Sequence, residues 1–175
     1  MIPDVLLAVL AAPPAGTSGE RTRRRVQLAA TLIGCQHVVI ANLFDQPVRD
    51  VQELTIAGAD PNSWIGARYQ LGHAITMAQH VLMAWGISEP TGSAREHHRA
   101  QIDWVTESLS RTPSNSWMLG DGPRHPSRWQ RYTSRIHPGL PFTEAVRMSL
   151  QHAPPPMSRQ PSHAQRVIRA NQLDR

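Results

Sequence analysis

The stretch from Asp4 to Leu10 (Asp-Val-Leu-Leu-Ala-Val-Leu) decides the fold class of this sequence. Its apolar residues run continuously instead of alternating with polar ones, and prolines bound it at Pro3 and Pro13. A strand that is buried on both faces has this pattern, and such strands occur in parallel sheets that helices cover on both sides. We therefore predict that this segment is a central strand of a parallel sheet.

Three later segments have the same apolar, β-branched character, and helical periodicity fills the intervals between them. The predicted strands cover residues 37–41, 80–84 and 117–119. The predicted helices run from Thr17 or Ser18 to Gly34 and over residues 50–56, 63–78, 93–111 and 143–150. Strands that alternate with helices favour right-handed crossovers. The sequence therefore predicts a single three-layer α/β/α domain over residues 1–150, with a mostly parallel, four-stranded central sheet.

The C-terminal segment 151–175 has a different composition, rich in proline and arginine. We predict that it is a mobile tail, because chain ends of this kind are poorly ordered unless other contacts hold them. Within it, residues 164–170 have the composition of a short basic helix.

Arginine supplies all eighteen basic side chains, and lysine is absent. Residues 1–88 carry six arginines and six acids, whereas residues 89–175 carry twelve arginines and seven acids, so the net charge of +5 lies in the second half. The guanidinium group is a planar fork that suits phosphate and carboxylate groups. This distribution favours a phosphate-bearing partner, which is either nucleic acid (DNA rather than RNA) or a nucleotide. A solvated basic surface is the alternative.

Several classes of protein are disfavoured by the sequence. Cys35 is the single cysteine, so no intrachain disulfide can form, and we expect a reducing, cytoplasmic location. No apolar run approaches the roughly 20 residues of a membrane helix, so we expect no membrane partner. A phosphate-binding loop of the lysine type is excluded, and the adjacent His97 and His98 would point in different directions on a helix. We therefore expect neither a metal site nor a cofactor.

Parallel α/β sheets bind ligands beyond the carboxyl ends of their strands. The loops predicted to leave these ends cover residues 11–19, 42–47, 85–86 and 120–129. We therefore expect Asn42, Trp85 and His125 to lie near one crevice. The last of these loops, Gly-Asp-Gly-Pro-Arg-His-Pro-Ser-Arg-Trp, is made rigid by its glycines and prolines.

The side chains of these loops are candidates for distinct roles. Asn42 carries an amide that can read a base edge, with a turn-forming role as the alternative. Phe44 and Trp85 are candidates for contact with a planar ligand, and for Phe44 a place in the core is the alternative. His125 is a candidate to stabilise a developing anion or to take up a proton. The phosphate-binding candidates are Arg124, Ser127 and Arg128.

Three short motifs follow one another along the chain: Asn42-Leu43-Phe44, Ala84-Trp85-Gly86 and Gly122-Pro123-Arg124-His125-Pro126. In this order they resemble the signatures of an uncharacterised family of bacterial and phage domains, over roughly residues 5–135. The layout is also similar to that of the uracil-DNA glycosylase superfamily. This second resemblance implies a glycosylase-like fold, a base-reading role for Asn42 and a DNA contact for the loop from His125 to Ser127.

The chain departs from that superfamily after its first strand. Where the superfamily has a catalytic Asp or Asn, the chain has Ala11-Ala12-Pro13-Pro14, and Glu20 is the only nearby carboxylate. Glycosidic cleavage passes through an oxocarbenium-like state that a carboxylate stabilises. If the protein is an enzyme, the resemblance implies hydrolysis of the N-glycosidic bond of a flipped-out or free modified base. Glu20 would then orient water and His125 would stabilise the departing base.

Three other functions also fit the sequence. A binding module could keep the fold without the chemistry and bind DNA or RNA in a salt-sensitive manner. An enzyme that acts on a free nucleoside or nucleotide would need no polymer. A scaffold protein with a basic face would need no such ligand.

Overall fold

The structure, a computed structural model, describes residues 4–153. Residues 154–175 lie outside the described part of the chain, and they include most of the predicted tail and the helix predicted over residues 164–170. Two residues of the predicted tail, Gln151 and His152, belong instead to a strand of the sheet.

A five-stranded sheet forms the centre of the fold, in the order β2-β1-β3-β4-β5. The strands are β1 (Val5–Leu10), β2 (His37–Asn42), β3 (His80–Met83), β4 (Asn115–Leu119) and β5 (Leu150–His152). The first four strands are parallel, which confirms the predicted α/β class and mostly parallel sheet. The predicted number of four strands was wrong, because β5 pairs antiparallel with β4. This strand has only three residues and two of them are exposed and polar, so it leaves no apolar run in the sequence.

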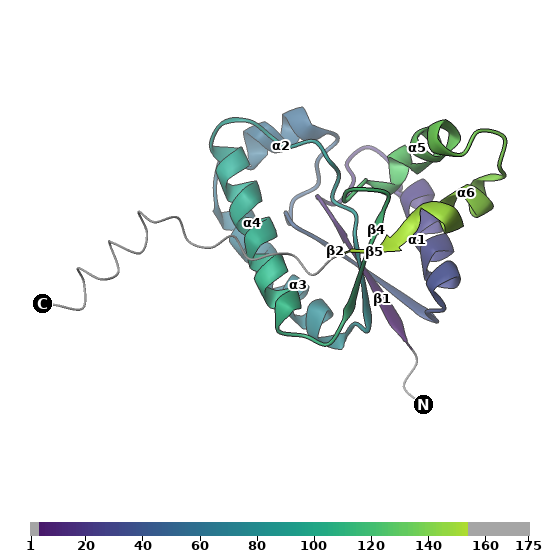
Figure 1. The fold of residues 1–175 in the computed structure, drawn as a ribbon. Coiled ribbons are helices and arrows are strands. Elements are labelled where there is room, and N and C mark those ends of the chain that lie inside the picture. The colour runs from purple at the N-terminus through teal and green to yellow at the C-terminus, as the bar shows by residue number, and fades with distance from the viewer. Residues whose placement is uncertain (1–3, 154–175) are drawn as a thin grey trace, which may run out of the picture.

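Helices cover both faces of the sheet (Figure 1). They are α1 (Glu20–Ile33), α2 (Val51–Ala57), α3 (Asn62–Met77), α4 (Gly92–Ser110), α5 (Trp129–Ile136) and α6 (Phe142–Ser149), with a short 3-10 helix η1 (Pro126–Arg128) before α5. The layer of α1, α5 and α6 lies on one face, and the layer of α2, α3 and α4 lies on the other. Within residues 4–153 no helix combines the length and apolarity needed to span a bilayer.

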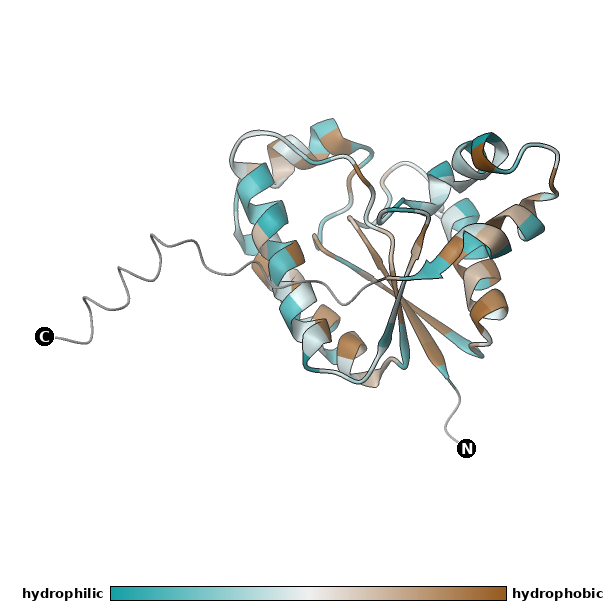
Figure 2. Cartoon of the chain, viewed as in Figure 1, coloured by the Kyte–Doolittle hydropathy of each residue, from teal (hydrophilic) through white to brown (hydrophobic). Residues whose placement is uncertain are grey.

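The central strand β1 supplies apolar residues to both layers, as its continuous apolar run predicts. Leu6, Ala8 and Leu10 pack in the cluster that includes residues of α1 and α6. Leu7 and Val9 pack in the cluster that includes residues of α3 and α4. Leu6 to Val9 are fully buried. Figure 2 shows the central strands largely in apolar colours, between helices that carry both polar and apolar residues.

The start of α1 differs from the prediction. The helix begins at Glu20, after Gly19 in the left-handed conformation (φ 69°), and not at Thr17 or Ser18. The loop that precedes it is held to the loop after β2, because the backbone N–H of Ala15 donates to Val48 (3.2 Å) and that of Val48 donates to Pro13 (3.0 Å). The loops after β1 and β2 therefore form one connected edge above the sheet.

Helix α5 was not predicted. Its inward positions are Trp129 and Thr133, which are spaced four residues apart and are both buried. A single tryptophan and a threonine give a weaker apolar periodicity than the aliphatic residues of the other helices. Trp129 is fully buried and its Nε1–H donates to the carbonyl of Arg124 (2.9 Å), so this residue fixes α5 against the loop after β4.

Candidate functional site

A cleft of about 950 Å³ lies at the carboxyl ends of the parallel strands. Its walls come from the loops after β1, β2, β3 and β4, together with parts of α1, α2, α4 and α5. Six of the predicted site residues line it: Asn42, Trp85, Arg124, His125, Ser127 and Arg128. The rule that ligand sites lie beyond the carboxyl ends of parallel strands therefore located the cleft from the sequence.

Two predicted site residues do not line the cleft. Phe44 is fully buried, and its ring centroid lies 4.9 Å from that of Trp64 in the core, so the ring is a packing residue here. Glu20 is the first residue of α1, and its carboxylate pairs with the exposed Arg24 (2.9 Å). Another acid lines the cleft instead. This is Asp50, whose Oδ1 accepts two backbone N–H bonds at the start of α2.

The loop from Gly120 to Trp129 is held in place by close packing. Gly120 has a positive φ of 69°, and a Cβ at this position would lie 2.2 Å from the hydroxyl oxygen of Tyr132. Only glycine fits this approach without a shift of the tyrosine. On the other side, the guanidinium of Arg25 donates to the carbonyl of Pro126 (2.6 Å). The loop therefore presents its side chains to the cleft from a fixed backbone.

His125 has one ring nitrogen bound within its own loop. Its Nδ1 lies 3.2 Å from the backbone N–H of Ser127, which donates to it, and 2.8 Å from the hydroxyl of Ser127. Burial, followed by the charges of Arg128 and Arg25, lowers the pKa of His125 below the usual histidine value. The ring is therefore neutral at neutral pH, and an Nδ1 that accepts from the backbone leaves the proton on Nε2. His125 can thus donate one hydrogen bond to a ligand.

A row of arginines follows one side of the cleft. Arg128, Arg131 and Arg135 all line it, and the spacing of three and four residues puts them on one face of η1 and α5. The row spans about 10 Å at the rise of an α-helix. All three side chains are exposed, and none makes an ion pair or hydrogen bond with another residue of the described range 4–153.

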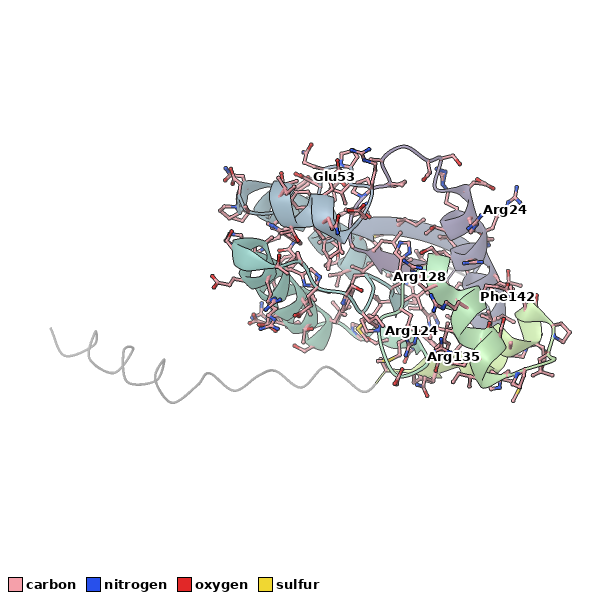
Figure 3. All side chains as sticks on the ribbon, turned by 90° about the horizontal axis from the view of Figure 1, so that it is seen from above. Arg24, Glu53, Arg124, Arg128, Arg135 and Phe142 are labelled. Carbon is pink, nitrogen blue, oxygen red and sulfur yellow. The ribbon has the colours of Figure 1, made fainter. Side chains whose placement is uncertain are left out.

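Arg124 continues this row but is held differently. Its guanidinium lies 4.1 Å from the ring centroid of Tyr132 and donates to the carboxylate of Asp121 (2.6 Å). Figure 3 shows Arg124, Arg128 and Arg135 on the side of the molecule that carries α5, with Glu53 on the α2 side. We call Arg124, Arg128, Arg131 and Arg135 the arginine wall. Arg131 and Arg135 were missed in the sequence because recognising them requires α5.

Three buried polar atoms at the cleft lack a hydrogen-bond partner among the described residues. They are Oδ1 of Asn42, Nδ1 of His98 and Nε of Arg124. His98 was set aside in the sequence because His97 and His98 cannot face the same way. The heptad-like spacing of Ala94, His98, Gln101 and Val105, all buried, was the signal that could have placed it inward.

The described residues contain no cluster of three or more His, Cys, Asp or Glu side chains that could hold a metal ion. What the cleft offers instead is a set of positively charged hydrogen-bond donors on one wall, together with amide, imidazole and indole groups. Such a set suits an anionic ligand that also carries a polar, uncharged part.

Comparison with family models gives one match. A model described as "Protein of unknown function (DUF1643)" matches residues 9–127. The matched segment begins within β1 and ends within η1, so it contains Asn42, Trp85, His98 and His125 but stops before α5. Comparisons with curated proteins and with solved structures give no match.

Proposed function

The chain belongs to the DUF1643 family, whose function is unknown, and we propose that it binds nucleic acid or a nucleotide in the cleft, with DNA as the favoured polymer. The observation that carries this proposal is the arginine wall. Three of its four guanidinium groups have no protein partner among residues 4–153, although they line the cleft. Charge-assisted bonds from arginine to phosphate are strong and directional, so an anion bearing several phosphates would satisfy this row.

The remaining lining residues support a ligand with a base. Asn42 at the end of β2 carries an amide, and Trp85 after β3 carries an indole, and both line the cleft. An amide can form paired hydrogen bonds with a base edge. The Nε2–H expected for the neutral His125 could donate to a carbonyl or phosphate oxygen between these groups and the arginine wall.

The proposal is tested by measuring the affinity of the full chain for a fluorescent single-stranded DNA oligonucleotide. We expect the double variant Arg128→Ala, Arg131→Ala to bind at least about tenfold more weakly at low salt, because each charge-assisted bond contributes more than a neutral one. Arg99→Ala is the matched control, since Arg99 is paired with Glu89 (2.7 Å) and does not line the cleft. Equal affinity of the double variant and the control would contradict the proposal.

A second candidate is hydrolysis of the N-glycosidic bond of a modified or flipped-out base. The motif order that is similar to the uracil-DNA glycosylase superfamily supports a glycosylase-like fold, and the neutral state of His125 favours the chemistry. A neutral imidazole N–H can stabilise a departing base anion without first losing a proton. Asp50 is a better placed carboxylate than Glu20, because it lines the cleft.

This candidate has its own assay. Double-stranded and single-stranded DNA with deaminated or otherwise modified bases would be incubated with the protein and then treated with alkali, which breaks the strand at sites that have lost a base. Strand breaks that His125→Ala or Asp50→Asn abolishes would support hydrolysis. The absence of breaks across a broad panel of bases would exclude hydrolysis of the N-glycosidic bond, and the binding function would remain.

A further inference from the structure

His98 is a buried histidine without a hydrogen-bond partner, and the function proposed above does not use it. The residue is 3% exposed and lines the cleft from α4. Its ring packs against Trp64 in an edge-to-face arrangement, with ring centroids 5.8 Å apart. Its Nδ1 is buried and bonds to no other described residue. Buried polar atoms are nearly always paired, so an unpaired one beside a cleft points to a group that the ligand supplies.

The other buried polar side chain of α4 is paired, which makes His98 an exception. Gln101 lies one turn further along α4 and is fully buried. Its amide N–H groups donate to the carbonyls of Leu43 (3.0 Å) and Trp64 (2.8 Å), and its oxygen accepts from Arg68 (2.9 Å). The interior next to α4 thus satisfies a buried amide completely but leaves the imidazole one turn away unsatisfied.

The same contacts join α4 to the end of β2, where Asn42 lies. Gln101, three residues after His98, is bonded to Leu43, the residue that follows Asn42. Asn42 and His98 both line the cleft, and Oδ1 of Asn42 is the second buried atom there without a partner. We call these two side chains the polar recess. Asn42 contributes to it from the end of β2 and His98 from α4, whereas the arginine wall lies on η1, on α5 and in the loop before them.

The chemistry of the polar recess differs from that of the arginine wall. A neutral imidazole offers one donor and one acceptor, and Oδ1 of Asn42 offers an acceptor. A phosphate group is an acceptor, so it could not satisfy an acceptor atom of the recess. A planar heterocycle edge that carries one donor and one acceptor satisfies both unpaired atoms, when Nδ1 of His98 carries the proton and Oδ1 of Asn42 accepts. Nucleobases present such edges.

We propose that His98 is a specificity-determining residue, which together with Asn42 binds the donor-and-acceptor edge of an uncharged heterocycle such as a nucleobase. This inference rests on the proposed nucleic-acid or nucleotide function and assigns the base-recognising part of that site. The electrostatics agree, because burial lowers the pKa of His98 more than the nearby Glu89 raises it, with Arg99 also lowering it. The ring is then neutral and suits a neutral partner.

The direct test uses the full chain with ¹⁵N-labelled histidine and nuclear magnetic resonance. The probes are adenosine, guanosine, cytidine and uridine, which carry bases but no phosphate. We expect at least one of them to shift the imidazole ¹⁵N signals of His98, assigned by their loss in His98→Phe, while the signals of His97 stay unchanged. His97 is the matched internal control, since it neighbours His98 but does not line the cleft. No shift at His98 with any of the four probes overturns the inference.

A binding assay separates this inference from a purely structural role. Two DNA oligonucleotides of equal length are compared, one with bases and one with abasic sites throughout, so that both carry the same phosphates. We expect His98→Phe to bind the base-bearing strand about tenfold more weakly and the abasic strand unchanged, while His97→Phe changes neither. Equal loss of affinity for both strands would contradict a role in base recognition.

The two proposals fail in different ways. If the arginine wall does not bind phosphate, the abasic oligonucleotide does not bind measurably, yet the nucleosides still shift the His98 signals. If the polar recess does not bind a base, both oligonucleotides bind through their phosphates and the nucleosides shift nothing.

Discussion

The layer of α1, α5 and α6 and the layer of α2, α3 and α4 use arginine in different ways. Residues 20–33 and 121–149, which form the first layer, hold nine arginines and three acids. Residues 45–77 and 89–111, which form the second layer, hold five arginines and eight acids. Both layers border the same cleft. The first lines it with five arginines and no acid, whereas the second lines it with Arg49 and Asp50, whose charges cancel.

The two layers also differ in whether their arginines have partners. In the second layer every arginine has a partner: Arg49 pairs with Glu53, Arg95 and Arg99 with Glu89, Arg111 with Glu107, and Arg68 bonds to Gln101. In the first layer the exposed guanidinium groups of Arg128, Arg131 and Arg135 have none among the described residues. The proposed anion site therefore rests on the arginines at the cleft that have no acidic partner, and not on the number of arginines in a layer.

The largest effect is expected from removing the tryptophan that anchors each layer. Trp129 and Trp64 are both buried, and each donates its Nε1–H to a backbone carbonyl, of Arg124 (2.9 Å) and Gly58 (2.8 Å) respectively. We expect either substitution by alanine to lower the free energy of unfolding by about 3–5 kcal/mol, measured by urea denaturation. Only Trp129→Ala should also weaken binding of an abasic oligonucleotide, which tests phosphate contacts alone, under conditions where the variant is folded. Undiminished binding by Trp129→Ala would show that the layer of α1, α5 and α6 does not position the binding site.

An intermediate effect is expected from pH, because each side of the cleft holds one histidine with a lowered pKa. These are His98 in α4 and His125 before η1. The unfolded chain takes up protons near the usual histidine value of about 6.5, whereas the folded chain does not. Stability is therefore fully present above about pH 6.5 and decreases as the pH falls below it.

Urea denaturation at about pH 7 and at about pH 5 measures this effect. We expect a lower midpoint at the acidic pH and a smaller difference in His98→Phe, which removes one of the two groups. The pKa values of the carboxylates of Glu53, Glu89 and Asp121 are lowered, mainly by arginine partners, so their contribution is lost only below about pH 4.5. A midpoint that rises on acidification would contradict the neutral state assigned to these histidines.

The smallest effect is expected from releasing single arginines from their acids. Asp121→Asn removes the partner of Arg124 at the cleft, and Glu89→Gln removes the partner of Arg99, which does not line the cleft. We expect Asp121→Asn to bind the DNA oligonucleotide about two- to threefold more tightly, since exposed ion pairs contribute little. Glu89→Gln should leave the affinity unchanged. A gain from Glu89→Gln equal to that from Asp121→Asn would show that charge alone governs binding.

Sequence reasoning located much of the fold for a physical reason. A strand that is buried on both faces must be apolar throughout, so β1 was visible, and the carboxyl-end rule then brought Asn42, Trp85 and His125 to one cleft. Strand β5 and helix α5 were not predicted, because a three-residue polar strand and a helix anchored by one tryptophan carry little periodic signal.

The burial of individual side chains was harder to predict. Phe44 follows the motif residue Asn42 closely, but Trp64 of α3 covers its ring, and this contact depends on how α3 packs. His98 was set aside as a metal ligand because it adjoins His97, and its place at the cleft depends on the rotation of α4 about its axis. Tertiary packing decided the place of Phe44, whereas for His98 the spacing of the buried residues of α4 was a local signal that the sequence analysis did not use.

The salt dependence of DNA binding is the most direct test of phosphate contacts at the arginine wall. Each phosphate contacted on a single strand adds about 0.7 to the slope of the logarithm of affinity against the logarithm of salt concentration. If the three arginines without partners each contact one phosphate, the slope has a magnitude of about 2 in the native chain and falls to less than half of that in Arg128→Ala, Arg131→Ala. A slope near zero, or one that the double variant leaves unchanged, would contradict the arginine wall as the phosphate site.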